Sequence, residues 1–322
     1  MKAVRIHAPG GPEVMQFEEV PEPVPGAGQA LVRIEAIGVN FIDTYQRSGL
    51  YKIELPATLG VEAAGIVTAV GAGVSEVQVG ARVAWAGPLG AYAEMAAVAA
   101  ARLVPVPAPV SARDAAAVML QGMTAHYLAA STYPLASGHT CLVHAAAGGV
   151  GLLLCQIARR RGARVIATVS AAAKAELARG AGADHVIRYD EEDFEPAVSR
   201  LTGGRGVDVA YDAVGQATYE RSMRVLAPRG MLVLYGQSSG PVPPIDPLLL
   251  AQRGSLFLTR PNLAHYTATR EELLARAGEV LAWLADGSLR VRIGLELPLA
   301  EARVAHRELA GRKTTGKVLL IP

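Results

Sequence analysis

The chain has 322 residues, of which 51% are hydrophobic and 19% are charged. This length is typical of two folded domains, and the low content of charge excludes a disordered chain. The formal net charge of +2 provides no strong basic field for a nucleic acid. The two cysteines, Cys141 and Cys155, are too few for a secreted disulfide framework, and we expect both to be buried thiols.

Residues 115–158 contain no Asp, Glu, Lys or Arg. Such a stretch is either a buried centre or a membrane element. A transmembrane helix needs about 20 consecutive apolar residues, and Gln121, Pro134 and His144 are among the residues that interrupt the run before that length. The N-terminal segment has no apolar region typical of a secretory signal. We therefore expect a cytoplasmic protein with the charge-free stretch in its core.

The first 110 residues are rich in short apolar runs separated by Pro and Gly. These runs predict strands at Ala3–Ile6, Ala30–Ile37, Ala64–Val70 and Ala81–Trp85. Short strands at this spacing are typical of a barrel or a sandwich. Ser111, with Asp114 three residues later, then predicts the start of a helix that extends toward Ala130.

From residue 140 onward, strands and helices alternate. The predicted strands are Thr140–His144, Arg164–Val169, His185–Tyr189, Val207–Asp212 and Gly230–Tyr235, and the predicted helices are Gly149–Gly162, Ala172–Gly180, Phe194–Thr202 and Thr218–Leu226. This alternation with short loops indicates a doubly wound parallel sheet. A strand at Ser255–Thr259, a helix at Thr269–Asp286 and a strand at Lys317–Ile321 are predicted beyond it.

The segment HAAAGGVG, residues 144–151, follows one of these strands and begins a helix. It matches the dinucleotide-binding fingerprint except that Ala146 replaces the first glycine. In that motif Gly148 lets the backbone approach a pyrophosphate, and Gly151 lets the helix pack closely on the strand. The free N–H groups at the helix start face the phosphates. The predicted phosphate-binding residues are Ala147, Gly148, Gly149, Val150 and Gly151. A turn of small residues without a ligand is the alternative.

The end of the second strand indicates which nicotinamide cofactor is bound. NAD enzymes carry Asp or Glu there, on the ribose 2′-hydroxyl. Here the strand ends at Val169 and is followed by Ser170 and then, as the next charged residue, Lys174. A hydroxyl and an ammonium suit a 2′-phosphate, so the sequence favours NADP over NAD. Lys174 on a solvated helix face is the alternative. Tyr189, which ends the third strand, is placed to close the same pocket or to lie half-buried in the strand.

Several longer segments point to one family. They are GVNFIDTYQRSGLY (38–51), LGVEAAGIV (59–67), GAYAE (90–94), HAAAGGVGLLLCQIA (144–158), YDAVG (211–215), YGQSSG (235–240) and KVLLIP (317–322). In these segments the chain resembles the zinc-independent quinone oxidoreductase group of the medium-chain dehydrogenase/reductase family, the group that includes zeta-crystallin. The resemblance implies an α/β fold with a GroES-like β-rich catalytic domain at residues 1–124 and 263–322. It implies an NADP-binding Rossmann domain at residues 125–262.

The resemblance also implies that the protein needs no metal. In zinc-dependent alcohol dehydrogenases of this fold, a Cys occupies the place of Asn40 and a His the place of Val61. Neither residue type here binds zinc, and the sequence contains no four-cysteine lobe. We therefore expect hydride transfer from NADPH to a quinone without a Lewis acid, with the protein holding the two flat rings in contact.

The substrate side of the site is expected in residues 38–51. Asn40 is a donor for a carbonyl or for the nicotinamide amide, and Tyr45 and Tyr51 are placed to flank an aromatic ring. The resemblance implies that these three residues line the cleft for nicotinamide and substrate. Core packing or stacking is the alternative for each tyrosine. We assign Asp43 to the helix start, and His144 to a structural role without acid–base function.

The resemblance implies further cofactor contacts and an assembly. The additional cofactor residues are Thr124, Tyr235, Gln237, Ser238, Ser239, Arg260 and Arg312. Surface ion pairs are the alternative for the two arginines. In the family, the strand that matches Ser255–Thr259 pairs across a two-fold axis, so we expect a homodimer that covers this sheet edge.

Two other functions remain open at this point. The first is an NADPH-dependent reductase of α,β-unsaturated carbonyls, which needs a hydrogen bond to the carbonyl oxygen. The second is a cofactor-binding structural or RNA-binding protein, a role that some zeta-crystallin relatives take. The low net charge, with one basic cluster at Arg159–Arg161, disfavours the RNA-binding alternative.

Overall fold

The computed structural model describes all 322 residues. The chain divides into two compact units. Unit 1 comprises Met1–Met123 and Tyr266–Pro322, and unit 2 comprises Thr124–His265. None of the helices combines the length and apolar character that a membrane crossing requires.

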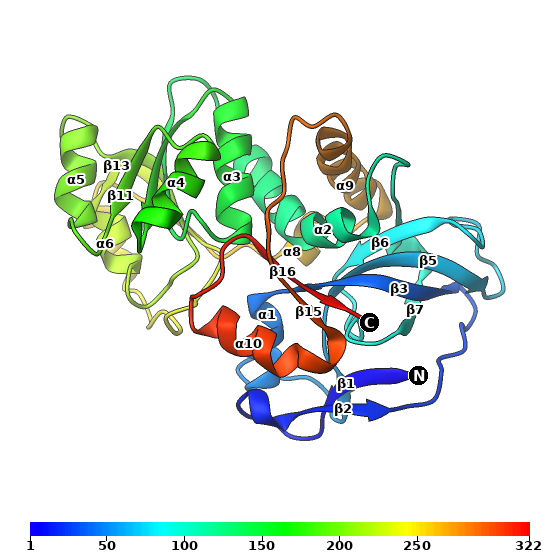
Figure 1. Cartoon of the computed structure of the whole chain (residues 1–322). Coiled ribbons are helices and arrows are strands. Elements are labelled where there is room, and N and C mark those ends of the chain that lie inside the picture. Colours follow the sequence, from blue (N-terminus) through cyan, green and yellow to red (C-terminus); the bar gives the residue numbers. More distant parts are fainter. The chain divides into compact units, whose positions relative to one another are not determined.

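Unit 1 consists mainly of antiparallel sheet (Figure 1). Its strands are β1 Lys2–Ile6, β2 Met15–Glu19, β3 Gln29–Val39, β4 Ala57–Thr58, β5 Glu62–Val70, β6 Arg82–Ala86, β7 Met95–Ala99, β8 Val104–Pro105, β15 Ile293–Pro298 and β16 Lys317–Ile321. Its helices are α1 Phe41–Arg47, α2 Ala112–Tyr127, which continues into unit 2, α9 Arg270–Ala285 and α10 Ala302–Ala310; the short α8 Leu263–Tyr266 lies at the boundary. The strands form a sheet of order β2-β1-β4 and a larger one of order β15-β16-β3-β5-β6-β8, with β7 paired to β3.

The core of unit 1 lies between these sheets and α10. Residues of the long strand β3, among them Val32, Ile34 and Ile37, pack with Trp85 and Tyr92 in one apolar cluster. The last strand, β16, pairs antiparallel with β3. The C-terminal segment therefore belongs to the same sheet as the N-terminal third of the chain.

Unit 2 is a doubly wound parallel sheet, as the alternation of strands and helices predicts. Its strands are β9 Thr140–Val143, β10 Arg164–Val169, β11 His185–Arg188, β12 Val207–Asp212, β13 Leu226–Leu234 and β14 Phe257–Thr259. Its helices are α3 Gly149–Arg160, α4 Ala172–Gly180, α5 Phe194–Leu201, α6 Tyr219–Arg224 and α7 Pro247–Gln252. The strand order is β11-β10-β9-β12-β13-β14 with parallel pairing throughout. Figure 1 shows α3 and α4 on one face of this sheet and α5 and α6 on the other.

Most of the charge-free stretch is buried, as expected, and its exposed residues lie mainly in the loop at 131–138. Both cysteines within it are fully buried free thiols, and β9, the central strand, is buried along its whole length. Such a strand is covered on both faces by helices, so a charged side chain there would be left without water.

The expected elements agree with the structure in their order, and some bounds differ. Ser111 caps α2 through Asp114 as expected, because its hydroxyl accepts from the Asp114 N–H at 3.0 Å. The α-helix ends at Tyr127, and a π-helical turn at Leu128–Thr132 continues the helical backbone past Ala130. Five strands, β2, β4, β7, β8 and β15, and the helices α7, α8 and α10 are absent from the expected set. Most of these strands are short or lie at sheet edges, where apolar alternation is weak.

Candidate functional site

The phosphate loop joins β9 to α3 and has the backbone geometry that the fingerprint requires. Gly148 is the N-cap residue with extended backbone (φ −75°, ψ 171°), so the first N–H groups of α3 have no partner within the helix. Ala145 has a positive φ of 52° and accepts from the Gly148 N–H at 2.9 Å. This turn leaves the start of α3 open to an anion.

Gly151 has the packing role expected of the third glycine. A Cβ atom built at this position would lie 2.5 Å from the Ala145 carbonyl oxygen and 2.7 Å from the Ala146 Cα. Both neighbours are backbone atoms, so the clash has no flexible side chain to relieve it. The helix therefore approaches the loop as closely as it does only because this residue has no side chain.

The loop lies where the order of the sheet reverses. β9 pairs with β10 on one side and with β12 on the other, and the chain proceeds outward from β9 in both directions. In open α/β sheets this reversal at the carboxyl ends of the strands is where ligands bind. The expected phosphate-binding residues, from Ala147 to Gly151, all lie at this position.

Ser170 and Lys174 are adjacent in space, as expected at the end of β10. The Lys174 ammonium donates to the Ser170 hydroxyl at 3.2 Å. No acidic residue follows Val169 before Glu176, and Glu176 is paired with Arg179 at 2.5 Å. Tyr189 follows the edge strand β11 with 53% of its surface exposed. The site therefore offers a hydroxyl and a cation where an NAD-specific site would offer an acid.

Hydrogen bonds connect the loops that follow β12 and β13. The Ser239 hydroxyl donates to the Val214 carbonyl oxygen at 2.7 Å and accepts from the Ala217 N–H at 2.9 Å. Arg260, which follows β14, donates to the Leu234 and Gly236 carbonyl oxygens at 2.9 and 2.7 Å. Arg260 thus fixes the end of β13. Tyr235, Gln237, Ser238 and Ser239 all lie in this loop region.

The two remaining expected cofactor residues lie elsewhere in the chain. Thr124 is buried in α2 at the start of unit 2. Arg312 follows α10 in unit 1 and has a positive φ of 56°. Their cofactor roles stay predictions.

In unit 1, Asn40 is buried in a network of hydrogen bonds within the protein. Its Nδ2 donates to the Glu62 carboxylate at 2.7 Å and to the Gly38 carbonyl oxygen at 3.2 Å. Its Oδ1 accepts from Lys317 Nζ at 2.9 Å and from Gln121 Nε2 at 3.1 Å. Every hydrogen-bonding position of this buried amide is therefore occupied within the protein. A ligand carbonyl would have to replace one of the two acceptors of Nδ2, and the role of Asn40 as a carbonyl donor stays a prediction.

A second buried network holds α1 in place. Asp43 accepts from the Asn40 N–H at 2.8 Å, which completes a capping box, and from the Tyr92 hydroxyl at 2.9 Å. Tyr92 in turn contacts His306 Nε2 at 3.0 Å, and Arg47 contacts His306 Nδ1 at 3.0 Å. Burial raises the pKa of Asp43 to about 7 and lowers the pKa of His306 to about 3. The assignment of Asp43 to the helix start agrees with this geometry.

Tyr45 and Tyr51 are brought together at the end of α1. Their ring centroids lie 5.3 Å apart in an edge-to-face arrangement, and Phe41 extends the cluster at 6.2 Å from Tyr45. Tyr51 is 37% exposed. The two rings form one partly exposed aromatic surface, and their contact with a substrate ring stays a prediction.

Sequence reasoning missed the charged members of these networks. The sequence analysis assigns no role to Glu62, which lies in the segment 59–67, or to Lys317, which begins an apolar strand. A lysine inside the sequence of a terminal core strand is itself a signal, because an ammonium there requires a buried acidic partner. No group of three or more His, Cys, Asp or Glu side chains is arranged to hold a metal ion.

Comparisons with known proteins agree with this architecture. Residues 26–108 match the family described as alcohol dehydrogenase GroES-like domain, and residues 149–276 match the family described as zinc-binding dehydrogenase. The chain is 48% identical to a quinone oxidoreductase of Pseudomonas aeruginosa, over 100% of this chain and 99% of that protein. It is 43% identical to a 2-haloacrylate reductase of a Burkholderia species, over 99% of this chain and 98% of that protein.

A solved structure gives the same result. The crystal structure of an Escherichia coli quinone oxidoreductase complexed with NADPH has a TM-score of 0.97 and 44% sequence identity, with 100% of both chains covered. Agreement of both domains, of the sequence and of the fold over the full length shows that the chain belongs to the quinone oxidoreductase group of the medium-chain dehydrogenase/reductase family.

Proposed function

We propose that the protein is an NADPH-dependent reductase of quinones. The observation that carries this proposal is the phosphate loop at the reversal point of the unit 2 sheet, with Gly148 as N-cap and Gly151 packed against backbone. The E. coli relative, whose structure holds NADPH, shares this fold. In this assignment unit 2 binds the cofactor and unit 1 provides the substrate side.

The residues of unit 2 fit the parts of NADPH one by one. The open N–H groups of α3 suit the pyrophosphate. Ser170 and Lys174, 3.2 Å apart, suit the 2′-phosphate, since an ammonium and a hydroxyl both donate to phosphate oxygens. Tyr189 at the adjacent strand end is placed to cover the adenosine part. When bound, the cofactor supplies the hydride.

Unit 1 contributes the surface on which a flat acceptor lies. Tyr45 and Tyr51 present a partly exposed aromatic surface, and aromatic rings stack or make edge contacts with a quinone ring. The buried network of Asn40 and Asp43 fixes the start of the helix that carries Tyr45. These groups orient the acceptor. A quinone is already electron-poor, so orientation is the main requirement, and it contributes up to about 7–11 kcal/mol in well-aligned reactions.

A reductase of activated alkenes is the second candidate. It is favoured by the similarity to the 2-haloacrylate reductase, which covers nearly the whole of both chains. Reduction of an α,β-unsaturated carbonyl develops negative charge on the carbonyl oxygen, which needs a hydrogen-bond donor. Both N–H groups of Asn40 already have acceptors inside unit 1, so donation to a carbonyl oxygen would have to replace one of these bonds, and this favours a quinone.

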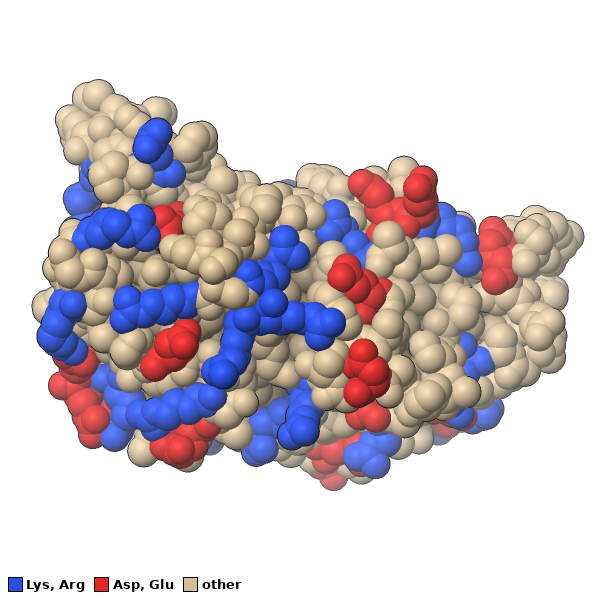
Figure 2. All heavy atoms as spheres, turned by 90° about the horizontal axis from the view of Figure 1, so that it is seen from above, with Lys and Arg blue, Asp and Glu red and all other residues tan.

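A cofactor-binding protein without catalysis, or one that binds RNA, is less consistent with the charges. Figure 2 shows basic side chains in a broken band on one face, with acidic side chains beside them. Many of the arginines are paired with carboxylates, for example Arg188 with Asp190 and Arg205 with Asp208 at 2.7 and 2.8 Å. Paired arginines have less capacity to neutralise phosphates.

We also propose a homodimer formed through β14, and a cytoplasmic location. β14 is the edge of the unit 2 sheet, and Phe257 on it is 57% exposed. An edge strand with an exposed aromatic side chain is a natural pairing surface. Sedimentation of the Phe257→Glu variant tests this, with a shift toward monomer expected. The two buried free thiols are consistent with a reducing compartment.

Steady-state kinetics test the proposed reaction. NADPH oxidation is measured with 1,4-benzoquinone and with an alkenal as alternative acceptors, at equal cofactor concentration. We expect turnover with the quinone and a higher kcat/KM for it. Activity confined to the alkenal would establish the second candidate, and salt-sensitive RNA binding without turnover would establish the third.

A further inference from the structure

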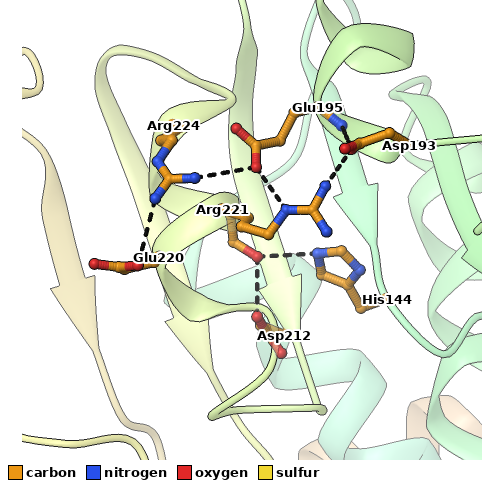
Figure 3. A network of polar contacts seen from close by, with 8 residues as sticks. His144, Asp193, Glu195, Asp212, Glu220, Arg221 and Arg224 are labelled. Atoms are coloured by element: carbon orange, nitrogen blue, oxygen red, sulfur yellow. Dashed lines mark hydrogen bonds and ion pairs between the residues drawn. The ribbon is translucent and has the colours of Figure 1, made fainter.

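The side chain of His144, at the carboxyl end of β9, is enclosed by three different elements of unit 2. It is 2% exposed. Its Nδ1 lies 2.8 Å from the Thr168 hydroxyl on β10, and its Nε2 lies 3.0 Å from the Ser222 hydroxyl on α6. Ser222 also donates to Asp212 Oδ2 at 2.9 Å. Figure 3 shows this connection from the His144 ring to the Asp212 carboxylate.

The chemistry of these groups fixes the direction of every hydrogen bond. The Asp212 carboxylate only accepts, so the single proton of Ser222 is directed to it. Ser222 therefore accepts from His144, which places the imidazole proton on Nε2. Nδ1 is then an acceptor, and the Thr168 hydroxyl donates to it. Burial lowers the pKa of His144, which agrees with a neutral ring that both donates and accepts.

The chain of hydrogen bonds joins the segments that surround the reversal point of the sheet. Thr168 also holds the phosphate loop through its backbone, because its carbonyl oxygen accepts from the Ala146 N–H at 3.2 Å. Asp212 shapes the loop after β12, since its Oδ1 accepts from the N–H groups of Val214 and Gly215 at 2.8 and 3.0 Å. This chain of hydrogen bonds, Thr168–His144–Ser222–Asp212, is the relay. It connects the β9–α3 loop, the end of β10 and the β12–α6 loop.

The outer side of the ring is closed by packing. The His144 ring meets Phe194 edge-on at a centroid distance of 5.0 Å, and the guanidinium of Arg221 lies 4.5 Å above the Phe194 ring. Arg221 is held by Asp193 and Glu195 (Figure 3). The ring therefore has one orientation available, and its hydrogen bonds are geometrically fixed.

We propose that His144 is a positioning residue for the cofactor site. Through Thr168, Ser222 and Asp212, His144 holds the phosphate loop in its binding geometry. The inference rests on the proposed function, because the ligand so positioned is the pyrophosphate of NADPH. His144 touches neither cofactor nor substrate in this role. His144 instead affects how tightly the phosphate loop binds the pyrophosphate.

Ser222→Ala and Thr168→Val test the proposal without altering His144 itself. The first leaves the Nε2–H without an acceptor, and the second leaves Nδ1 without a donor. Thr202→Val is the matched control: its hydroxyl donates to the Val198 carbonyl oxygen at 2.8 Å and accepts from the Gly206 N–H at 3.0 Å. These partners lie near the amino ends of the strands of the same sheet, opposite the carboxyl ends where the phosphate loop lies.

Dissociation constants for two ligands distinguish a positioning effect from a general loss of structure. NADPH carries the pyrophosphate, and adenosine 2′-monophosphate carries the 2′-phosphate without it. We expect the dissociation constant for NADPH to rise about tenfold in each relay variant, as loss of one buried hydrogen bond implies. The constant for the monophosphate should stay as in wild type, and Thr202→Val should change neither.

Three results would overturn the inference. One is an unchanged NADPH affinity in folded relay variants. Another is an equal loss for both ligands. The third is the same loss in Thr202→Val. If the wild-type chain bound no NADPH at all, the proposed function itself would fail, and this outcome is distinct from the first three because it appears before any substitution is made.

Discussion

Lys317 and Glu62 form an ion pair in which neither side chain is exposed to solvent. The two residues come from opposite ends of the chain, since Glu62 begins β5 and Lys317 begins β16. Glu62 also accepts from the Leu120 N–H of α2 at 2.6 Å, and both charges bind the Asn40 amide. The pair therefore joins the two sequence segments of unit 1 at the base of the helix that carries Tyr45.

Breaking this pair from one side should be costly. Lys317→Met leaves a buried carboxylate without its cation, and Glu62→Gln leaves a buried ammonium without its anion. We expect each to lower the free energy of unfolding by about 3–5 kcal/mol. Both tryptophans, Trp85 and Trp283, lie in unit 1, so urea unfolding followed by tryptophan fluorescence reports on this unit.

The double variant is the control for the charge itself. With both charges removed, no uncompensated ion remains, so Lys317→Met/Glu62→Gln should lose clearly less than the sum of the two single variants. Additive losses would show that the two side chains stabilise unit 1 independently and would refute the coupling.

The contrast between the two units shows what sequence alone could predict. The Rossmann-type sheet and its phosphate loop were predictable because parallel strands and Gly148–Gly151 follow local rules of period and spacing. The Asn40 network was not predictable in the same way. Its members, such as Glu62 and Lys317, are 255 residues apart, and no local pattern specifies which buried charges meet.

The same limit applies to the direction of a side chain. The sequence predicts that Asn40 lies in the site segment, but whether its amide faces a ligand or the protein depends on Glu62 and Lys317. The sequence predicts a structural role for His144, but its partners Thr168 and Ser222 follow only from strand register and helix packing.

Asp43 and His306 should give opposite pH dependences to the stability of unit 1. Burial raises the pKa of Asp43 from 3.8 to about 7, so between these values the folded state binds a proton that the unfolded state has lost. Stability from Asp43 therefore falls as pH rises through this window. Burial lowers the pKa of His306 from 6.5 to about 3, so its contribution rises with pH across that window.

The two slopes nearly cancel between pH 4 and 6.5, and single substitutions should reveal them. In Asp43→Asn, stability should rise with pH over this range. In His306→Gln it should fall, in each case by about 1 kcal/mol per pH unit. Unfolding curves by tryptophan fluorescence at half-unit pH steps measure both slopes. Variant profiles parallel to that of wild type would contradict the opposed titration.

Gly151→Ala should impair the phosphate loop. The added methyl group would meet the Ala145 carbonyl oxygen at 2.5 Å and the Ala146 Cα at 2.7 Å, so the loop or α3 must shift. We expect weaker NADPH binding by calorimetry, together with a lower melting temperature. Gly180→Ala is the matched control in unit 2, because a Cβ there meets nothing within 4 Å. It should leave affinity unchanged and alter stability by no more than about 1 kcal/mol.

Lys174→Ala tests the preference for NADPH over NADH. The Lys174 ammonium lies 3.2 Å from the Ser170 hydroxyl, and no acid stands at the end of β10 to bind a 2′-hydroxyl. Loss of one charge-assisted hydrogen bond to a phosphate is worth about 1.5–3 kcal/mol. The ratio of kcat/KM for NADPH to that for NADH should therefore fall by about ten- to a hundredfold, mostly through KM for NADPH.

Arg179→Ala, on the same helix and paired with Glu176, should leave the ratio unchanged. An unchanged ratio in Lys174→Ala would mean that the 2′-phosphate binds elsewhere. A surface lysine that is screened by salt does not distinguish NADPH from NADH.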